Sequence, residues 1–141
     1  MIAANPISGT GLGTFGLAYP AFKTYGSTDI WDQAHNDYLQ LLAESGLVGF
    51  ILLLAGMGLF LLRHVLPVLA GPWRLQEPVA LGAGLGLVTL LFHALVDFNL
   101  QIPSNGLLFV LLGGLVVRFG GRAGTEGDGT VEPGGTSGPA A

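Results

Sequence analysis

The chain has 141 residues and a formal net charge of −4, with 50% hydrophobic and only 10% charged residues. A typical soluble domain carries about 25% charged residues, so this composition favours a membrane protein. The chain contains no cysteine, which excludes disulfides and thiolate metal sites. Its five basic residues form no cluster, so nucleic-acid binding, which depends on grouped Lys and Arg, is not expected.

The first 33 residues are rich in glycine, aromatic and polar residues and lack sustained helical periodicity. We therefore expect an irregular loop segment over 1–33, and we expect no signal peptide at Met1. Gly11-Leu-Gly13-Thr-Phe-Gly16 matches the glycine pattern of dinucleotide-binding loops. That pattern needs a strand before it and a helix after it, and only ten residues precede it. An irregular glycine-rich loop is the better interpretation.

A polar cluster stands directly before the first apolar stretch: His35, Asn36, Asp37, Tyr38 and Gln40. Polar and titratable groups are costly to bury beside a hydrophobic span, so the cluster indicates a site at the water–lipid boundary. The His35 imidazole can accept a proton near neutrality or, once protonated, bind a phosphate oxygen. Asn36 and Asp37 are equally good caps for a helix N-terminus, and Tyr38 is equally typical of an interfacial aromatic.

Three apolar stretches predict spanning helices, at about 46–62, 79–96 and 104–118. The third stretch is short, and it crosses only if part of the preceding polar turn is included or the bilayer adjusts. Gly82 and Gly86 form a small-residue face that would pack against a partner helix. Residues 119–141 have almost nothing to bury and are expected to be disordered.

Charge asymmetry orients these helices. Four of the five basic residues lie in the connection 63–78 or just after the third helix: Arg63, Arg74, Arg118 and Arg122. The positive-inside rule places both regions in the cytoplasm, so the polar cluster and the turn 97–105 fall together on the outer face. Asp97 follows His93 by one helical turn, which predicts an ion pair between them. The expected fold is an all-α membrane protein with three transmembrane helices, preceded by an irregular loop and followed by a disordered tail.

Three blocks of the sequence resemble the O-antigen ligase and polymerase family of bacterial envelope glycan transferases. The blocks are the glycine-rich stretch 5–20, Ala34-His-Asn-Asp-Tyr-Leu-Gln with its continuation to 49, and His93-Ala-Leu-Val-Asp-Phe-Asn-Leu-Gln with its continuation to 105. They occur in the family's order. Family members have many more spanning helices, so the resemblance implies that 1–33 ends a periplasmic loop and that 34–118 is the C-terminal membrane region of such a protein.

The resemblance also implies an activity. Family members transfer a glycan from an undecaprenyl-diphosphate carrier to a sugar hydroxyl at the periplasmic face of the bacterial inner membrane, without metal or cofactor. The acceptor is lipid A-core for ligases and a growing glycan chain for polymerases. His35 would be catalytic, and four neighbours would bind substrate: Asn36, Asp37, Tyr38 and Gln40. The chain would be multi-pass with a cytoplasmic C-terminus, in contact with membrane lipid, the carrier-linked glycan and its acceptor.

Two alternatives compete with this interpretation. The chain could be a non-catalytic membrane fragment that packs with other helices. A transporter with His93 and Asp97 as a proton relay is less favoured, because these residues lie near an interface and not at the bilayer centre. The chain alone is expected to be inactive, since Lys23 is the only basic residue on the outer side and a diphosphate normally attracts several cationic donors.

Overall fold

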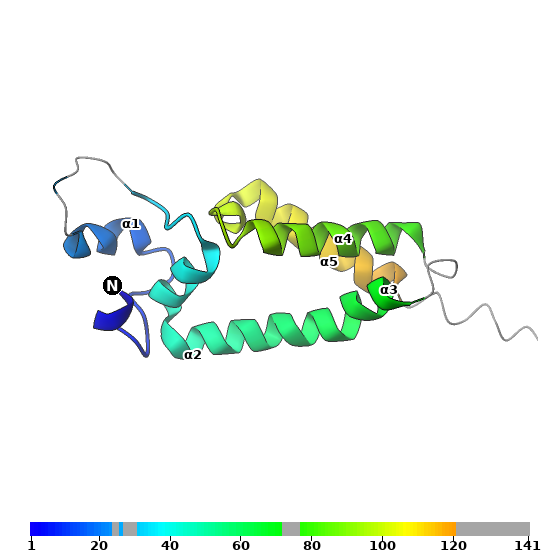
Figure 1. Ribbon diagram of the computed structural model, residues 1–141, viewed down its shortest axis with the longest axis horizontal. Coiled ribbons are helices and arrows are strands. Elements are labelled where there is room, and N and C mark those ends of the chain that lie inside the picture. The colour runs from blue at the N-terminus through cyan, green and yellow to red at the C-terminus, as the bar shows by residue number, and fades with distance from the viewer. Residues whose placement is uncertain (24–25, 27–30, 72–76, 121–141) are drawn as a thin grey trace, which may run out of the picture.

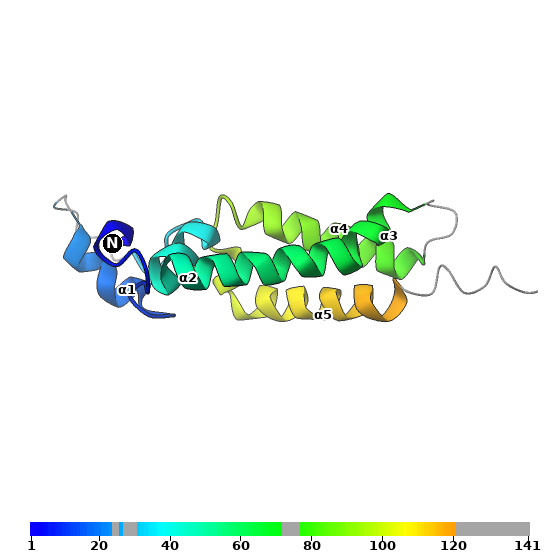
Figure 2. The ribbon, with the colours of Figure 1, turned by 90° about the horizontal axis from the view of Figure 1, so that it is seen from below.

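The computed structural model describes residues 1–23, 26, 31–71 and 77–120. Within these ranges the chain is all-helical and has no strand, which confirms the predicted helical class. Three long helices run along the long axis: α2 (Asp37–Phe60), α4 (Pro78–His93) and α5 (Pro103–Phe119) (Figure 1). Figures 1 and 2 together show α2 on one side of the molecule, with α4 and α5 side by side on the other.

The N-terminal segment is more ordered than the sequence predicted. A short helix, α1 (Phe15–Ala18), lies between two 3₁₀ turns, Ile2–Ala4 and Tyr19–Phe22. Phe15 is buried and its ring stacks on Tyr19 at a centroid distance of 5.1 Å. The prediction of an irregular loop is therefore wrong for these stretches, because short-range turns satisfy backbone groups where no helical periodicity is visible.

Among the described residues, one helical stretch is long and apolar enough to cross a membrane. Helix α2 continues through a π-helical turn (Leu61–Val65) into α3 (Leu66–Ala70). Together they span 34 residues, Asp37–Ala70, with a mean hydropathy of 2.3. The predicted crossing at 46–62 lies inside this stretch.

The other two apolar helices are shorter, with 16 residues in α4 and 17 in α5, against about 20 for a full crossing. The second helix ends at His93 and not at 96, because the backbone tightens there into i to i−3 hydrogen bonds, from Leu95 N to the Phe92 carbonyl and from Val96 N to the His93 carbonyl. The third begins at Pro103, a residue favoured at the first helical position. That all three helices span a membrane stays a prediction. The tail predicted to be disordered, 119–141, lies outside the described ranges except for its first two residues, Phe119 and Gly120.

Helix α2 is broken at Gly46, where φ is 65° and ψ is −176°. The N-terminal segment binds both sides of the break through four backbone hydrogen bonds of 2.8 to 3.3 Å: Thr10 N to the Ala43 carbonyl, Gly11 N to Glu44, Leu47 N to Pro6 and Val48 N to Ile7. Buried backbone groups need such partners. The break is therefore tolerated because the N-terminal segment pairs with the backbone groups that the broken helix leaves without an intrahelical partner.

The apolar core lies at the far end of the molecule from this break. It comprises one buried residue of the π-helical turn, one of α3, three of α4 and one of α5: Val65, Val68, Ala80, Ala83, Leu87 and Val116. The predicted small-residue face is divided between two environments. A Cβ on Gly86 would meet Leu112 of α5, whereas one on Gly82 would meet open space. Packing of that face on a separate partner helix stays a prediction.

We predict that Gly46→Ala destabilises the fold and that Gly56→Ala does not. Gly46 has positive φ, and a Cβ there would collide with the Ile7 backbone, so the substitution should cost more than about 1 kcal/mol. Gly56 lies within α2 with nothing within 4 Å of an added Cβ, and alanine there improves helix propensity by about 0.5–1 kcal/mol. Thermal unfolding followed by circular dichroism in detergent micelles measures both. Equal melting temperatures for the two variants would contradict this account of the break.

Candidate functional site

The predicted site lies where the start of α2 meets the connection between α4 and α5 (Figure 1). His35 precedes the helix with φ of 49°, a left-handed conformation uncommon for a residue other than glycine. Its Nδ1 lies 3.4 Å from Oδ1 of Asp97. The ring makes edge contacts with Trp31 and Phe98, at centroid distances of 5.8 and 5.0 Å. The side chain is 54% exposed, so it is oriented by neighbours and still reachable from outside.

The partner of Asp97 differs from the expected one. Helix α4 ends at His93, and the turn that follows carries Asp97 away from the helix face. In the described part of the chain its carboxylate contacts the imidazole of His35, not that of His93. The same carboxylate oxygen accepts a hydrogen bond of 2.8 Å from the Phe98 amide, which holds the carboxylate in place beside the imidazole.

Asn36 caps the N-terminus of α2. This was one of the two interpretations of the residue, the other being substrate binding. Its Oδ1 accepts from the Leu39 amide at 2.9 Å, and its Nδ2 donates to the Leu95 carbonyl at 2.7 Å. The next amide, Asp37 N, donates to the Ala94 carbonyl at 2.9 Å. These bonds join the beginning of α2 to the turn after α4. The sequence blocks 34–49 and 93–105 therefore meet in space.

Asp37 is buried, with 7% exposure. Its Oδ2 accepts from the Leu100 amide at 2.8 Å, while its buried Oδ1 has no hydrogen-bond partner among the described residues. Tyr38 donates through its hydroxyl to the Leu91 carbonyl at 3.0 Å. Both residues line a cavity of about 250 Å³ whose other walls are one amide and six apolar side chains: Gln101, Leu41, Leu53, Leu54, Met57, Leu91 and Leu100.

Gln40 points into the protein and is only 2% exposed. Its Oε1 accepts from the Ala34 amide at 3.0 Å, and its Nε2 donates to Oε1 of Glu44 at 3.3 Å. Both ends of the amide are therefore bonded to this chain. Of the five residues predicted for the site, Gln40 is the one whose geometry serves the fold most directly.

Glu44 belongs to this region and was not predicted from the sequence. Its carboxylate is 4% exposed and accepts hydrogen bonds from Gly13 N at 2.8 Å and Phe15 N at 3.0 Å. The glycine-rich motif over 11–16 thus surrounds the chain's own carboxylate. One signal could have revealed it, since Glu44 is the only charged residue between Tyr38 and Phe60 and a buried charge requires donors.

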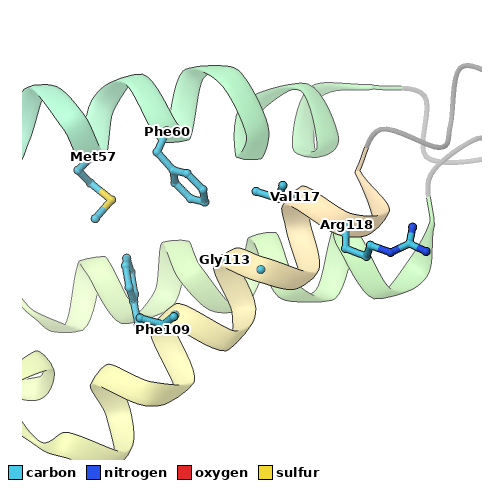
Figure 3. Close-up of a pocket in the computed structure, with 8 residues that line it drawn as sticks. Met57, Phe60, Phe109, Gly113, Val117 and Arg118 are labelled. Carbon is cyan, nitrogen blue, oxygen red and sulfur yellow. The ribbon is translucent and has the colours of Figure 1, made fainter.

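A larger apolar cavity of about 700 Å³ lies between α2 and α5, away from His35. Figure 3 shows Met57 and Phe60 of α2 facing Phe109 and Gly113 of α5, with Arg118 at one end. Within the described ranges, no three His, Asp or Glu side chains come close enough together to hold a metal ion. The candidate site is the His35 cluster together with the smaller cavity lined by Asp37 and Tyr38.

Residues 1–54 match the family model described as O-antigen ligase. The resemblance seen in the first two sequence blocks is thereby confirmed for this part of the chain. The third block, 93–105, lies outside the match, although the structure joins it to the second. Searches of the curated proteins and of the solved structures gave no match.

We predict that Asp37→Ala loosens the turn after α4, whereas Asp37→Asn does so much less. Alanine leaves the Leu100 amide without its acceptor, which costs about 1–3 kcal/mol if that amide stays buried. Asparagine keeps an oxygen that can accept this bond. Amide hydrogen exchange at Leu100, read in detergent micelles, should accelerate strongly only in the alanine variant. Unchanged exchange in that variant would show that the bond contributes nothing to the turn.

Proposed function

We propose that this chain, which resembles O-antigen ligases over residues 1–54, carries the acceptor-activating group of a membrane glycan transferase. The transfer moves a glycan from an undecaprenyl-diphosphate carrier to a sugar hydroxyl at the periplasmic face. The observation that carries this proposal is the pair formed by exposed His35 and Asp97. A histidine oriented by a carboxylate is a common general base.

The geometry of the pair suits proton abstraction from a hydroxyl. Nδ1 of His35 faces Asp97, so Nε2 is the nitrogen that can take the proton of the acceptor hydroxyl. The Asp97 carboxylate then stabilises the imidazolium that forms. The edges of Trp31 and Phe98 limit rotation of the ring, which keeps Nε2 aimed in one direction.

Substrate would be held by the polar residues beside the cavity. Asp37, Tyr38 and Gln101 supply hydrogen-bonding groups at its wall, and the remaining wall is apolar. Such a lining suits a sugar hydroxyl presented next to a hydrocarbon chain. Asn36 would contribute indirectly, because its side chain is used to cap α2 and to bind the Leu95 carbonyl. We assign Gln40 a supporting role for the same reason.

Exposed apolar side chains support a membrane location. They run along all three long helices, with Leu52, Leu85 and Leu107 as examples. Contiguous apolar surface of this kind is rare on soluble monomers. We propose that all three helices cross the inner membrane, with the bilayer adjusting to the two shorter ones. Arg63 lies in the π-helical turn before α3 and Arg118 in the last turn of α5. Both elements lie toward the end of the molecule opposite the start of α2 (Figure 1), so that end, and with it the C-terminus, would be cytoplasmic.

The alternative function is a non-catalytic fragment that packs with other helices. The open apolar cavity between α2 and α5 favours it, because a further helix could fill that space. The two functions differ at His35. A packing fragment does not require an imidazole there, whereas a transferase does.

We predict that His35→Asn reduces glycan transfer about 100-fold or more in the intact membrane protein that carries this chain. Asparagine tolerates the left-handed backbone, so the variant removes the proton acceptor without adding backbone strain. His64→Ala is the matched control, because His64 packs on Phe60 in the turn at the opposite end and should leave transfer unchanged. The measurement is transfer per unit of protein in the membrane. Wild-type transfer by His35→Asn, or a loss that follows protein abundance, would remove His35 from catalysis.

A second prediction concerns topology. Because the chain has no cysteine, single cysteines report sidedness without background. Leu12 is 71% exposed, and Leu12→Cys should react with a membrane-impermeant maleimide added outside. Ala70 is exposed at the other end, and Ala70→Cys should react only after permeabilisation. The reverse pattern would invert the proposed orientation.

A further inference from the structure

The environment of Glu44 is unusual for a carboxylate in an apolar helix. The donors that reach it from the described residues are uncharged: Gly13 N, Phe15 N and Gln40 Nε2. Hydrogen bonds to an ionised acceptor are about twice as strong as neutral ones. Because a buried carboxylate without donors would be strongly unfavourable, these groups are held tightly around it.

These contacts extend toward His35. Gln40 donates to Glu44 with one end of its amide and accepts from Ala34 N with the other, at 3.0 Å. Ala34 is the residue directly before His35. A continuous chain of hydrogen bonds therefore runs from the glycine-rich segment, through Glu44 and Gln40, to the backbone that carries the imidazole.

His35 needs such support on both sides. A non-glycine residue in a sparsely populated conformation costs about 1–3 kcal/mol and persists only where its surroundings determine it. On the far side of His35, the Asn36 side chain and the Asp37 amide are bonded to the Leu95 and Ala94 carbonyls. On the near side, the described bond that holds the backbone is Ala34 N to Gln40.

We propose that Glu44 is a positioning residue for His35, acting through Gln40. The carboxylate orients the Gln40 amide, Gln40 holds Ala34, and Ala34 keeps His35 in the left-handed conformation that directs its ring to Asp97. The catalytic consequence rests on the function proposed for His35. The effect of Glu44 on the position of the His35 ring is independent of that proposed function.

The position of the ring can be read without any activity. The chain has three histidines, so labelling with ¹⁵N-histidine gives a spectrum of three side chains in detergent micelles. Gln40→Met removes the link at nearly constant volume and leaves Glu44 its two backbone donors. Glu44→Gln is the second variant, because it removes the charge and keeps an acceptor for one of those donors. We expect both variants to shift the His35 ring resonances and to leave those of His64 unchanged.

The transfer assay in the intact membrane protein supplies the second readout. In Gln40→Met, a displaced general base should lower kcat by about tenfold to 100-fold, with little change in KM. The melting temperature of this variant should stay close to that of the wild type. Unshifted His35 resonances in both variants would overturn the inference. A different pair of results would separate the two proposals. If the His35 resonances shift in these variants but His35→Asn keeps full transfer, the positioning role is upheld and the proposed function is overturned.

Discussion

The arrangement depends on one constraint, the burial of the Glu44 carboxylate next to the break of α2 at Gly46. A carboxylate inside an apolar helix requires donors, and a broken helix requires partners for its freed backbone groups. The N-terminal segment meets both needs, since its glycines place amides on the carboxylate and its backbone bonds to both sides of the break. The loop and the helix therefore form one structural unit.

This unit explains how an exposed histidine can be held in a strained conformation. Two sets of hydrogen bonds hold the start of α2. Glu44 and Gln40 hold the residue before His35, and the turn after α4 holds Asn36. Many of these bonds use backbone groups, whose positions vary less than those of side chains. The imidazole is thus presented on a rigid support, with a carboxylate and two aromatic edges around it. Such preorganisation suits the general-base role proposed for His35.

The two ends of the molecule differ in how they are stabilised. Hydrogen bonds join the elements at the His35 end, whereas apolar side chains of α3, α4 and α5 form the core at the other end. Next to this core, a large apolar cavity lies between α2 and α5 (Figure 3). In a bilayer such a surface is compatible with lipid or with further helices, because hydrocarbon solvates it as well as protein does.

Composition and apolar periodicity were sufficient to predict an all-helical protein, the apolar stretches and the polar cluster, because these depend on local residue types. The family resemblance came instead from specific residue blocks in a fixed order, and the family model supports it over residues 1–54. The Asn36 cap was also within reach, since capping is decided within one helical turn. Local patterns did not reveal which carboxylate faces His35. That choice depends on the positive φ of His35 and on the turn that ends α4 early at His93. Nor could they show that the glycine motif binds Glu44 (31 residues away between Gly13 and Glu44), because only the folded chain brings amides and carboxylate together.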